Sequence, residues 1–261
     1  MHRADGTTGG LAGRVAAVTG ATSGSGRAIA SRFAQEGATV VMLARGSERL
    51  EELETTVGGD VVGIPTDIGD PDSVDAAFAE IKRRYGKLDV LVNNAAVYRP
   101  CPIEELSNED ILAQTRTNFL GPVYTCRAAI PLLRAAGGGD IVNTSSETTI
   151  DPFPHLSMYS STKAALETFS RMLMAELPDD DIRVTTLVQG VALGEGGGST
   201  DWSWDPDRAE QATALWERQG YLARVSGTQG GQSVEAVADV HVYVVTRPRG
   251  QKLDTIHVRS Y

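Results

Sequence analysis

The stretch that most constrains the fold is a short apolar run followed at once by a glycine-rich turn. The run Val15-Ala16-Ala17-Val18 leads into Thr19-Gly20-Ala21-Thr22-Ser23-Gly24-Ser25-Gly26, and a helical pattern with Ile29 and Phe33 on one side comes next. Glycines let the backbone approach a pyrophosphate, and a helix that follows offers free N–H groups to it. This order of strand, turn and helix therefore predicts a dinucleotide site, with an ordinary glycine turn as the alternative.

Buried runs and helical patterns alternate along the rest of the chain. We expect further strands at residues 39–43, 61–64, 88–92, 140–144, 182–188 and 253–258, and helices at residues 47–57, 71–85, 109–133, 157–177, 205–219 and 233–245. Such alternation predicts a parallel sheet wound by right-handed crossovers. The fold class expected is one doubly wound, Rossmann-type α/β domain with a seven-stranded parallel sheet.

Composition excludes several classes of partner. The 261 residues carry a net charge of −10, which argues against nucleic-acid and anionic-membrane surfaces. No apolar stretch reaches ~18 residues, so no membrane span is expected. The two cysteines, Cys101 and Cys126, lack metal-ligand spacing, so no metal site is predicted and a reduced, cytoplasmic setting fits best. We interpret residues 1–10 as a flexible tail and residues 11–261 as the domain.

Three predicted strand ends carry residues suited to a cofactor. Arg45 follows the second strand, where an NAD site usually has an acidic residue that holds the ribose 2′-OH. A guanidinium suits a 2′-phosphate instead, which favours NADP(H) over NAD(H), although a solvated arginine is the alternative. Asp67-Ile68 and Asn94-Ala95 follow the next two strands, and small residues there leave room for a flat ring and a ribose.

Tyr159 and Lys163 are four residues apart, which places them on one face of a predicted helix. An ammonium near a phenol favours the phenolate and lowers the phenol's pKa. A tyrosine tuned in this way can transfer a proton near neutral pH. The alternative is a chance pair on a solvated helix.

Taken together, these motifs resemble the short-chain dehydrogenases/reductases, in their shorter, single-domain branch. The resemblance covers Leu11 to Val188: Thr19-Gly20-x-x-x-Gly24-x-Gly26 looks like the family's cofactor motif, and Asn93-Asn94-Ala95 like its sheet-supporting motif. It implies that Asp67 binds adenine. It also implies a catalytic tetrad, formed by Asn118, Ser146, Tyr159 and Lys163.

The resemblance gives each tetrad member an expected role. Ser145 and Ser146 are adjacent, and the family's spacing to Tyr159 selects Ser146, whose hydroxyl would hold the substrate oxygen. Pro122 crowds the carbonyl four residues back, at Asn118, which predicts a kink and a carbonyl free for a relay water. A packing kink without chemistry is the alternative.

The sequence departs from the family after the sixth strand. Gln189-Gly190 stands where Pro-Gly is common, and Gly194 stands where a threonine helps to seat the nicotinamide. Gly190 is nevertheless expected to contact the cofactor. The variable segment 194–231, with Trp202, Trp204 and Trp216, is interpreted as a substrate lid, or else as a packed surface loop. Phe153, His155 and Val191 are further candidates for the pocket.

These expectations combine into one functional prediction. The chain is predicted to be an NADP(H)-dependent oxidoreductase, a homotetramer, that interconverts a secondary alcohol and a ketone by hydride transfer. Aromatic residues in the lid suggest an apolar or cyclic small-molecule substrate. The alternatives are a non-catalytic nucleotide-binding regulator on the same fold, and a lyase or epimerase on the same scaffold.

Overall fold

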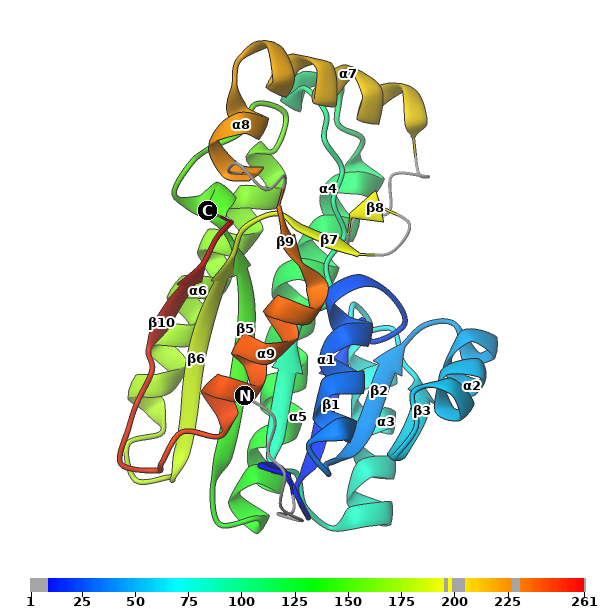
Figure 1. Cartoon of the computed structure of the whole chain (residues 1–261), viewed down its shortest axis with the longest axis vertical. Helices are drawn as coiled ribbons and strands as arrows, with labels where there is room; N and C mark the ends of the chain where they lie inside the picture. The colour runs from blue at the N-terminus through cyan, green and yellow to red at the C-terminus, as the bar shows by residue number, and fades with distance from the viewer. Residues whose placement is uncertain (1–8, 195–196, 199–204, 227–230, 261) are drawn as a thin grey trace.

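A twisted parallel sheet forms the centre of the protein (Figure 1). The computed structural model describes residues 9–194, 197–198, 205–226 and 231–260. The seven strands of the sheet lie in the order β10-β6-β5-β4-β1-β2-β3, and every pair is parallel. Their bounds are β1 (Val15–Thr19), β2 (Thr39–Ala44), β3 (Asp60–Pro65), β4 (Val90–Asn93), β5 (Gly139–Ser146), β6 (Ile182–Gln189) and β10 (Thr255–Val258). The predicted fold class is confirmed.

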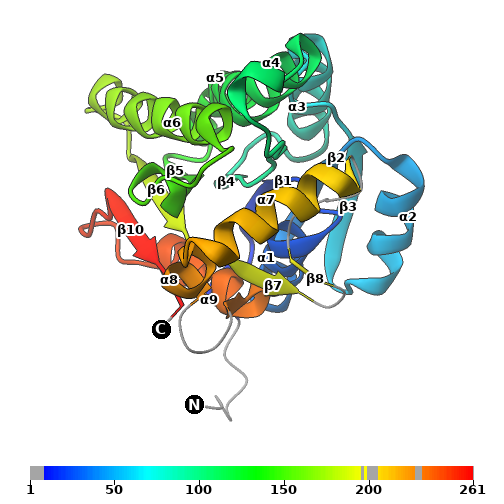
Figure 2. The same cartoon turned by 90° about the horizontal axis from the view of Figure 1, so that it is seen from above.

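Helices cover both faces of this sheet (Figure 2). One layer holds α3, α4, α5 and α6, and the other holds α1, α2 and α9, while α7 and α8 lie over the carboxyl end of the strands (Figure 1). The bounds are α1 (Gly24–Gln35), α2 (Ser47–Thr56), α3 (Pro71–Tyr85), α4 (Asn108–Thr115), α5 (Gly121–Ala135), α6 (Ser157–Glu176), α7 (Pro206–Arg218), α8 (Tyr221–Ser226) and α9 (Val234–Val245). A small second sheet joins β8 (Gly197–Gly198), β7 (Ala192–Gly194) and β9 (Gln232–Ser233).

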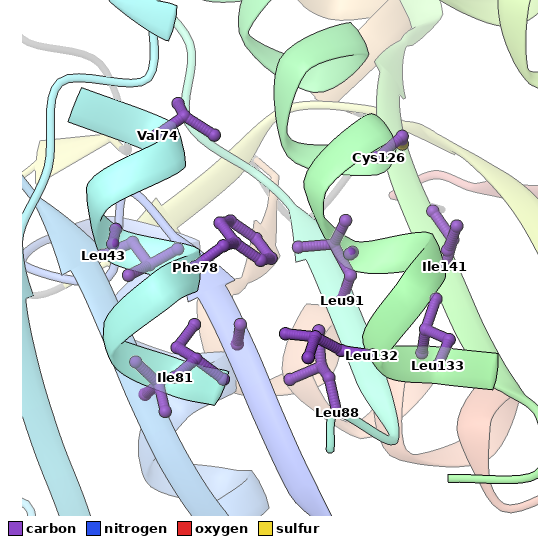
Figure 3. Packing of buried hydrophobic residues seen from close by; sticks show 14 of the residues in the cluster. Leu43, Val74, Phe78, Ile81, Leu88, Leu91, Cys126, Leu132, Leu133 and Ile141 are labelled. Carbon is purple, nitrogen blue, oxygen red and sulfur yellow. The ribbon is translucent and has the colours of Figure 1, made fainter. Parts of the chain in front are cut away.

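The core consists of two apolar layers, one on each face of the sheet. Alternate residues of a strand point to opposite faces, so Ala17 packs toward α3 and α5 while Ala16 and Val18 pack toward α1 and α9. Figure 3 shows the first layer, where Phe78 of α3 faces Leu91 of the sheet. A sheet buried on both faces needs apolar residues at every position, which explains the continuous runs in the sequence.

The helix expected at residues 109–133 is interrupted. The structure has α4, then a π-helical segment at Arg116–Leu120, then α5. Pro122 lies in the first turn of α5, where a backbone N–H has no partner within the α-helix, so the proline is tolerated there and α5 begins beside it. The expected kink at Pro122 is therefore a π-segment that contains Asn118.

Other boundaries shift by a few residues. Helix α2 begins at Ser47 as expected, with Gly46 at the N-cap position, and ends one residue early at Thr56. Strand β5 extends through Ser146, which therefore ends the strand instead of following it. Of the expected tail, residues 1–8 lie outside the described part, and the Gly10 N–H donates to Glu36 Oε2 at 2.8 Å. Nowhere in the described part does a helix combine the length and the apolar character needed to cross a membrane.

Candidate active site

The glycine turn packs tightly against the end of β4. Gly20 has a φ of 66°, and a Cβ there would stand 2.8 Å from the Ala95 Cα. A Cβ at Gly26 would stand 2.1 Å from the Gly20 carbonyl oxygen. Glycine is therefore required at both positions, and the turn presents its backbone and the first residues of α1 to the pocket.

Hydrogen bonds fix this turn to the neighbouring strand. Thr19 Oγ1 accepts from the backbone N–H of Asn94 at 3.0 Å and of Ala95 at 3.1 Å. The Asn94 side chain donates to the Thr19 carbonyl at 3.2 Å. Deeper in the core, Asn93 donates to Asn143 Oδ1 at 2.8 Å and accepts from Thr125 Oγ1 at 2.7 Å. The Asn93-Asn94-Ala95 motif thus supports the carboxyl edge of the sheet.

Arg45, Asp67 and Ile68 lie together along one side of the same pocket. Arg45 follows β2 directly and is exposed to solvent. Asp67 Oδ1 accepts from the Gly69 N–H at 2.9 Å, so the carboxylate is held by its own loop. A guanidinium is chemically suited to bind a phosphate group.

Lys163 and Tyr159 lie at the other end of the pocket, on the first turns of α6. The Lys163 ammonium is buried and donates to the Thr144 carbonyl at 2.8 Å, and burial lowers its pKa to about 8. The Lys163 Nζ lies 5.8 Å from the centre of the Tyr159 ring.

The pKa of Tyr159 is shifted in the direction opposite to the one expected. Burial raises its pKa, and a hydrogen bond with Ser146 opposes that rise. Lys163 was expected to lower this pKa; within the protein alone that expectation is wrong, because its ammonium points to the Thr144 carbonyl. Tyr98 packs edge-on against Tyr159, with ring centroids 5.2 Å apart, and contributes to the burial. Tyr159 is thus held as a protonated phenol beside the Ser146 hydroxyl.

Asn118 is buried behind the pocket. Its Oδ1 accepts from the Val97 N–H at 2.7 Å, and its Nδ2 donates to the Val97 carbonyl at 2.8 Å. Nδ2 also lies 3.3 Å from Thr162 Oγ1 on α6. Asn118 therefore ties the pocket-lining segment after β4 to the helix that carries Tyr159.

One pocket of about 620 Å³ connects these groups. Its lining includes every predicted catalytic and cofactor-binding residue except Gly24, Gly26 and Asn118. It also includes residues that the sequence analysis did not single out, among them Thr66, Tyr98, Arg99, Glu147, Leu156 and Leu222. The volume lies within the range usual for small-molecule sites.

Part of this pocket has an aromatic wall. Trp216 of α7 packs on Phe153 at 5.5 Å and on Tyr98 at 6.3 Å, and its Nε1 donates to the Pro154 carbonyl at 2.9 Å. Phe153 and Val191 line the pocket as expected, whereas His155 is not among the described residues that line it. Trp202 and Trp204 lie outside the described residues.

The end of β6 and the residues that follow it line the pocket. Gln189 donates to Ser25 Oγ at 3.4 Å, and Gly190 donates its N–H to the Val258 carbonyl at 2.8 Å. Gly194 ends β7, in the small sheet that the sequence analysis did not predict. Short glycine-rich strands of two or three residues lack the alternating pattern by which strands are predicted.

Comparisons with known proteins agree with this geometry. The family model described as short chain dehydrogenase matches residues 14–197. D-threitol dehydrogenase of Mycolicibacterium smegmatis is 36% identical over 208 residues, which cover 78% of this chain and 79% of that protein. A serine dehydrogenase in its closed form with NADP+ superposes with a TM-score of 0.81, 27% identity and 94% of both chains covered. L-sorbose reductase of Gluconobacter frateurii, with NADPH and L-sorbose, gives a TM-score of 0.82, 29% identity and 97% coverage of both chains. The chain therefore belongs to the short-chain dehydrogenase/reductase family.

Proposed function

We propose that this protein interconverts a secondary alcohol and a ketone with NADP(H) as the preferred cofactor. The observation that carries the proposal is the single pocket that joins the glycine turn and Arg45 at one end to Ser146, Tyr159 and Lys163 at the other. The glycines of the turn leave room for a pyrophosphate, and the Arg45 guanidinium suits a 2′-phosphate, so together they suit a dinucleotide that carries one. When bound, NADPH supplies the hydride.

The protein's own residues handle the proton and the substrate oxygen. Tyr159 donates its phenolic proton to the ketone oxygen, and the Ser146 hydroxyl orients that oxygen and stabilises its developing charge. Lys163 places a positive charge at the Thr144 carbonyl, below the ring of Tyr159. Asn118 fixes the backbone of Val97 to Thr162 of α6 by hydrogen bonds.

The aromatic wall supports a substrate with an apolar or cyclic body. Tyr98, Phe153 and Trp216 offer ring faces and edges, and such residues dominate the lining of small-molecule pockets. We propose that α7, which carries Trp216, belongs to a lid that excludes water from the reacting atoms.

Tyr159→Phe is the direct test of the catalytic proposal. This variant keeps the ring that packs on Tyr98 and removes the proton donor. We expect ketone-dependent NADPH oxidation to fall by about 10²-fold or more, as for loss of a general acid, while NADPH binding is retained. Near-normal turnover would remove Tyr159 from the mechanism. A wild type that oxidises no cofactor with any ketone would favour the non-catalytic regulator.

A further inference from the structure

Glu147 occupies an unusual position in the active site. It directly follows Ser146 at the end of β5 and begins a short 3-10 turn, Glu147–Thr149. Its side chain is 5% exposed, and the residue lines the pocket. A charged residue this deeply buried normally has a charged or hydrogen-bonding partner.

The Glu147 carboxylate is only half satisfied. Oε1 lies 3.7 Å from Arg259 Nη1, at the edge of ion-pair distance, and the Arg259 side chain is 46% exposed. Oε2 is buried and has no hydrogen-bond partner within the described part of the chain. Burial, with Asp151 adding to it and Arg259 opposing it, raises the pKa of this carboxyl.

Gly190 makes room for this carboxylate. A Cβ at Gly190 would stand 2.6 Å from Glu147 Oε2, closer than atoms in contact allow. Because Gly190 also lines the pocket, the end of β6 and the carboxylate share one wall. Because position 190 has no side chain, the Glu147 carboxylate can occupy the space next to it.

A neighbouring glutamate shows what full satisfaction looks like. Glu167 of α6 accepts from Ser145 Oγ at 2.6 Å and from Thr149 Oγ1 at 2.8 Å. Glu167 is not among the residues that line the pocket. A buried acceptor without a donor costs about 1–3 kcal/mol. We therefore look to a bound ligand for the donor that Glu147 Oε2 lacks.

We infer that Glu147 is a specificity residue that accepts a hydrogen bond from a hydroxyl group on the carbon next to the reacting one. The inference rests on the proposed function. Ser146 holds the reacting oxygen, and Glu147 is its chain neighbour on the same wall, so the adjoining carbon is the one within reach. The substrates are then vicinal diols and α-hydroxy ketones whose apolar body lies on the aromatic wall.

A neutral hydroxyl fits this site better than an ammonium group. The Arg259 guanidinium already lies near Oε1 and disfavours a second positive charge. The carboxylate oxygen remains a strong acceptor for an O–H donor. A site built to bond a substrate hydroxyl discriminates strongly against the analogue that lacks it.

The test uses four matched alcohols with NADP+: cyclohexanol, cis- and trans-cyclohexane-1,2-diol, and 2-aminocyclohexanol. For the wild type we expect kcat/KM to be at least about tenfold higher for a diol than for cyclohexanol, in line with one hydrogen bond to a charged acceptor. Glu147→Met removes both oxygens and should bring that ratio to within about threefold of one. Glu147→Gln keeps one acceptor and should retain most of the ratio. Glu176→Met, which replaces an exposed glutamate at the end of α6 and outside the pocket, should leave the ratio as in the wild type.

Each other outcome overturns the inference or separates it from the proposed function. An unchanged diol preference in Glu147→Met overturns it, and a fall in Tm alongside would assign Glu147 a structural role. We expect no such fall, because Arg259 stays solvated without its partner. A wild type that prefers the amino alcohol to the diols overturns the choice of hydroxyl.

If the wild type oxidises none of these alcohols, the proposed function fails. Calorimetric binding of diol and cyclohexanol to wild type and Glu147→Met then decides the role of Glu147.

Discussion

The buried ammonium of Lys163 makes the site sensitive to pH. The ammonium donates to the Thr144 carbonyl, and burial lowers its pKa to about 8. The folded protein therefore loses this charge as the pH rises through about 8, well before an exposed lysine would. Below about pH 8, therefore, a charged Lys163 ammonium lies under the ring of Tyr159.

We therefore predict that ketone reduction weakens in mild alkali. The kcat/KM for NADPH reports the essential groups of the free enzyme, and it should be level below about pH 7 and fall about tenfold per pH unit above about 8. The measurement is initial rates of NADPH oxidation from pH 6 to 10. A profile that stays level to about pH 10 would show that Lys163 is not required in its charged form.

Arg45 tests the preference for NADP(H). If its guanidinium binds the 2′-phosphate, Arg45→Ala should weaken NADPH binding by roughly 1.5–3 kcal/mol, as for hydrogen bonds to charged groups, and leave NADH binding nearly unchanged. Arg49→Ala is the matched control, since Arg49 is an exposed arginine on α2 that pairs with Glu52. Equal losses for both cofactors in Arg45→Ala, or a wild type that prefers NADH, would contradict the assignment.

Individual site residues differed in how far the sequence revealed them. Gly20, Tyr159 and Lys163 were predictable because their spacing expresses a geometric requirement, a turn or one face of a helix. Glu147 was not, because a glutamate after a strand is ordinary turn chemistry until its burial and its missing donor are seen. The environment of Lys163 was also hidden, because the carbonyl that it contacts is 19 residues away in sequence.

The same contrast holds for whole elements. The bounds of α3 were predicted because its ends carry local signals: Asp70 accepts from the Asp72 N–H, Pro71 opens the helix, and Gly86 closes it with a φ of 70°. The π-segment at Arg116–Leu120 carries no such signal. Its geometry depends on the tertiary bonds of Asn118 to Val97 and Thr162, which no local pattern contains.

Helix α9 packs against α1 and carries a fully buried histidine. His241 Nδ1 lies 2.9 Å from the Val237 carbonyl, Nε2 has no partner among the described residues, and burial lowers the pKa of the ring to about 4. Between about pH 6.5 and pH 4 the unfolded chain binds a proton at this position that the folded chain does not. Stability is therefore lost as the pH falls through this window.

The predicted size of this effect is about 2 kcal/mol of unfolding free energy between pH 7 and pH 5. His241→Leu removes the titrating ring, so its unfolding free energy should depend less on pH than that of the wild type by about this amount. Urea unfolding at both pH values measures the difference. Parallel pH dependence in the two proteins would show that His241 does not titrate as its burial implies.

At the scale of the whole molecule, one face of the protein keeps apolar residues in solvent. Leu112 of α4 is 49% exposed and Met172 of α6 is 57% exposed, and these helices pack in the same outer layer (Figure 2). The other helical layer, α1, α2 and α9, lies on the opposite side of the sheet, and there Tyr243 of α9 is 51% exposed. Exposed apolar residues gathered on neighbouring helices are typical of subunit contacts.

We therefore predict that the protein is a homotetramer in which the layer of α4, α5 and α6 forms a subunit contact. Closed symmetry uses the same patch twice, so one apolar face suffices for a dimer, and a second contact between dimers completes the tetramer. Light scattering at micromolar concentration should give about four times the chain mass of 27.7 kDa.

Leu112→Glu combined with Met172→Glu places carboxylates in the contact and should reduce the particle from a tetramer to a dimer, about half the tetramer's mass, because a desolvated, unpaired charge is costly there. Glu51→Lys on α2 reverses an exposed charge in the other helical layer and should leave the mass unchanged. A wild-type particle of 27.7 kDa would refute the assembly, and an intact tetramer in the double variant would place the contact on another face.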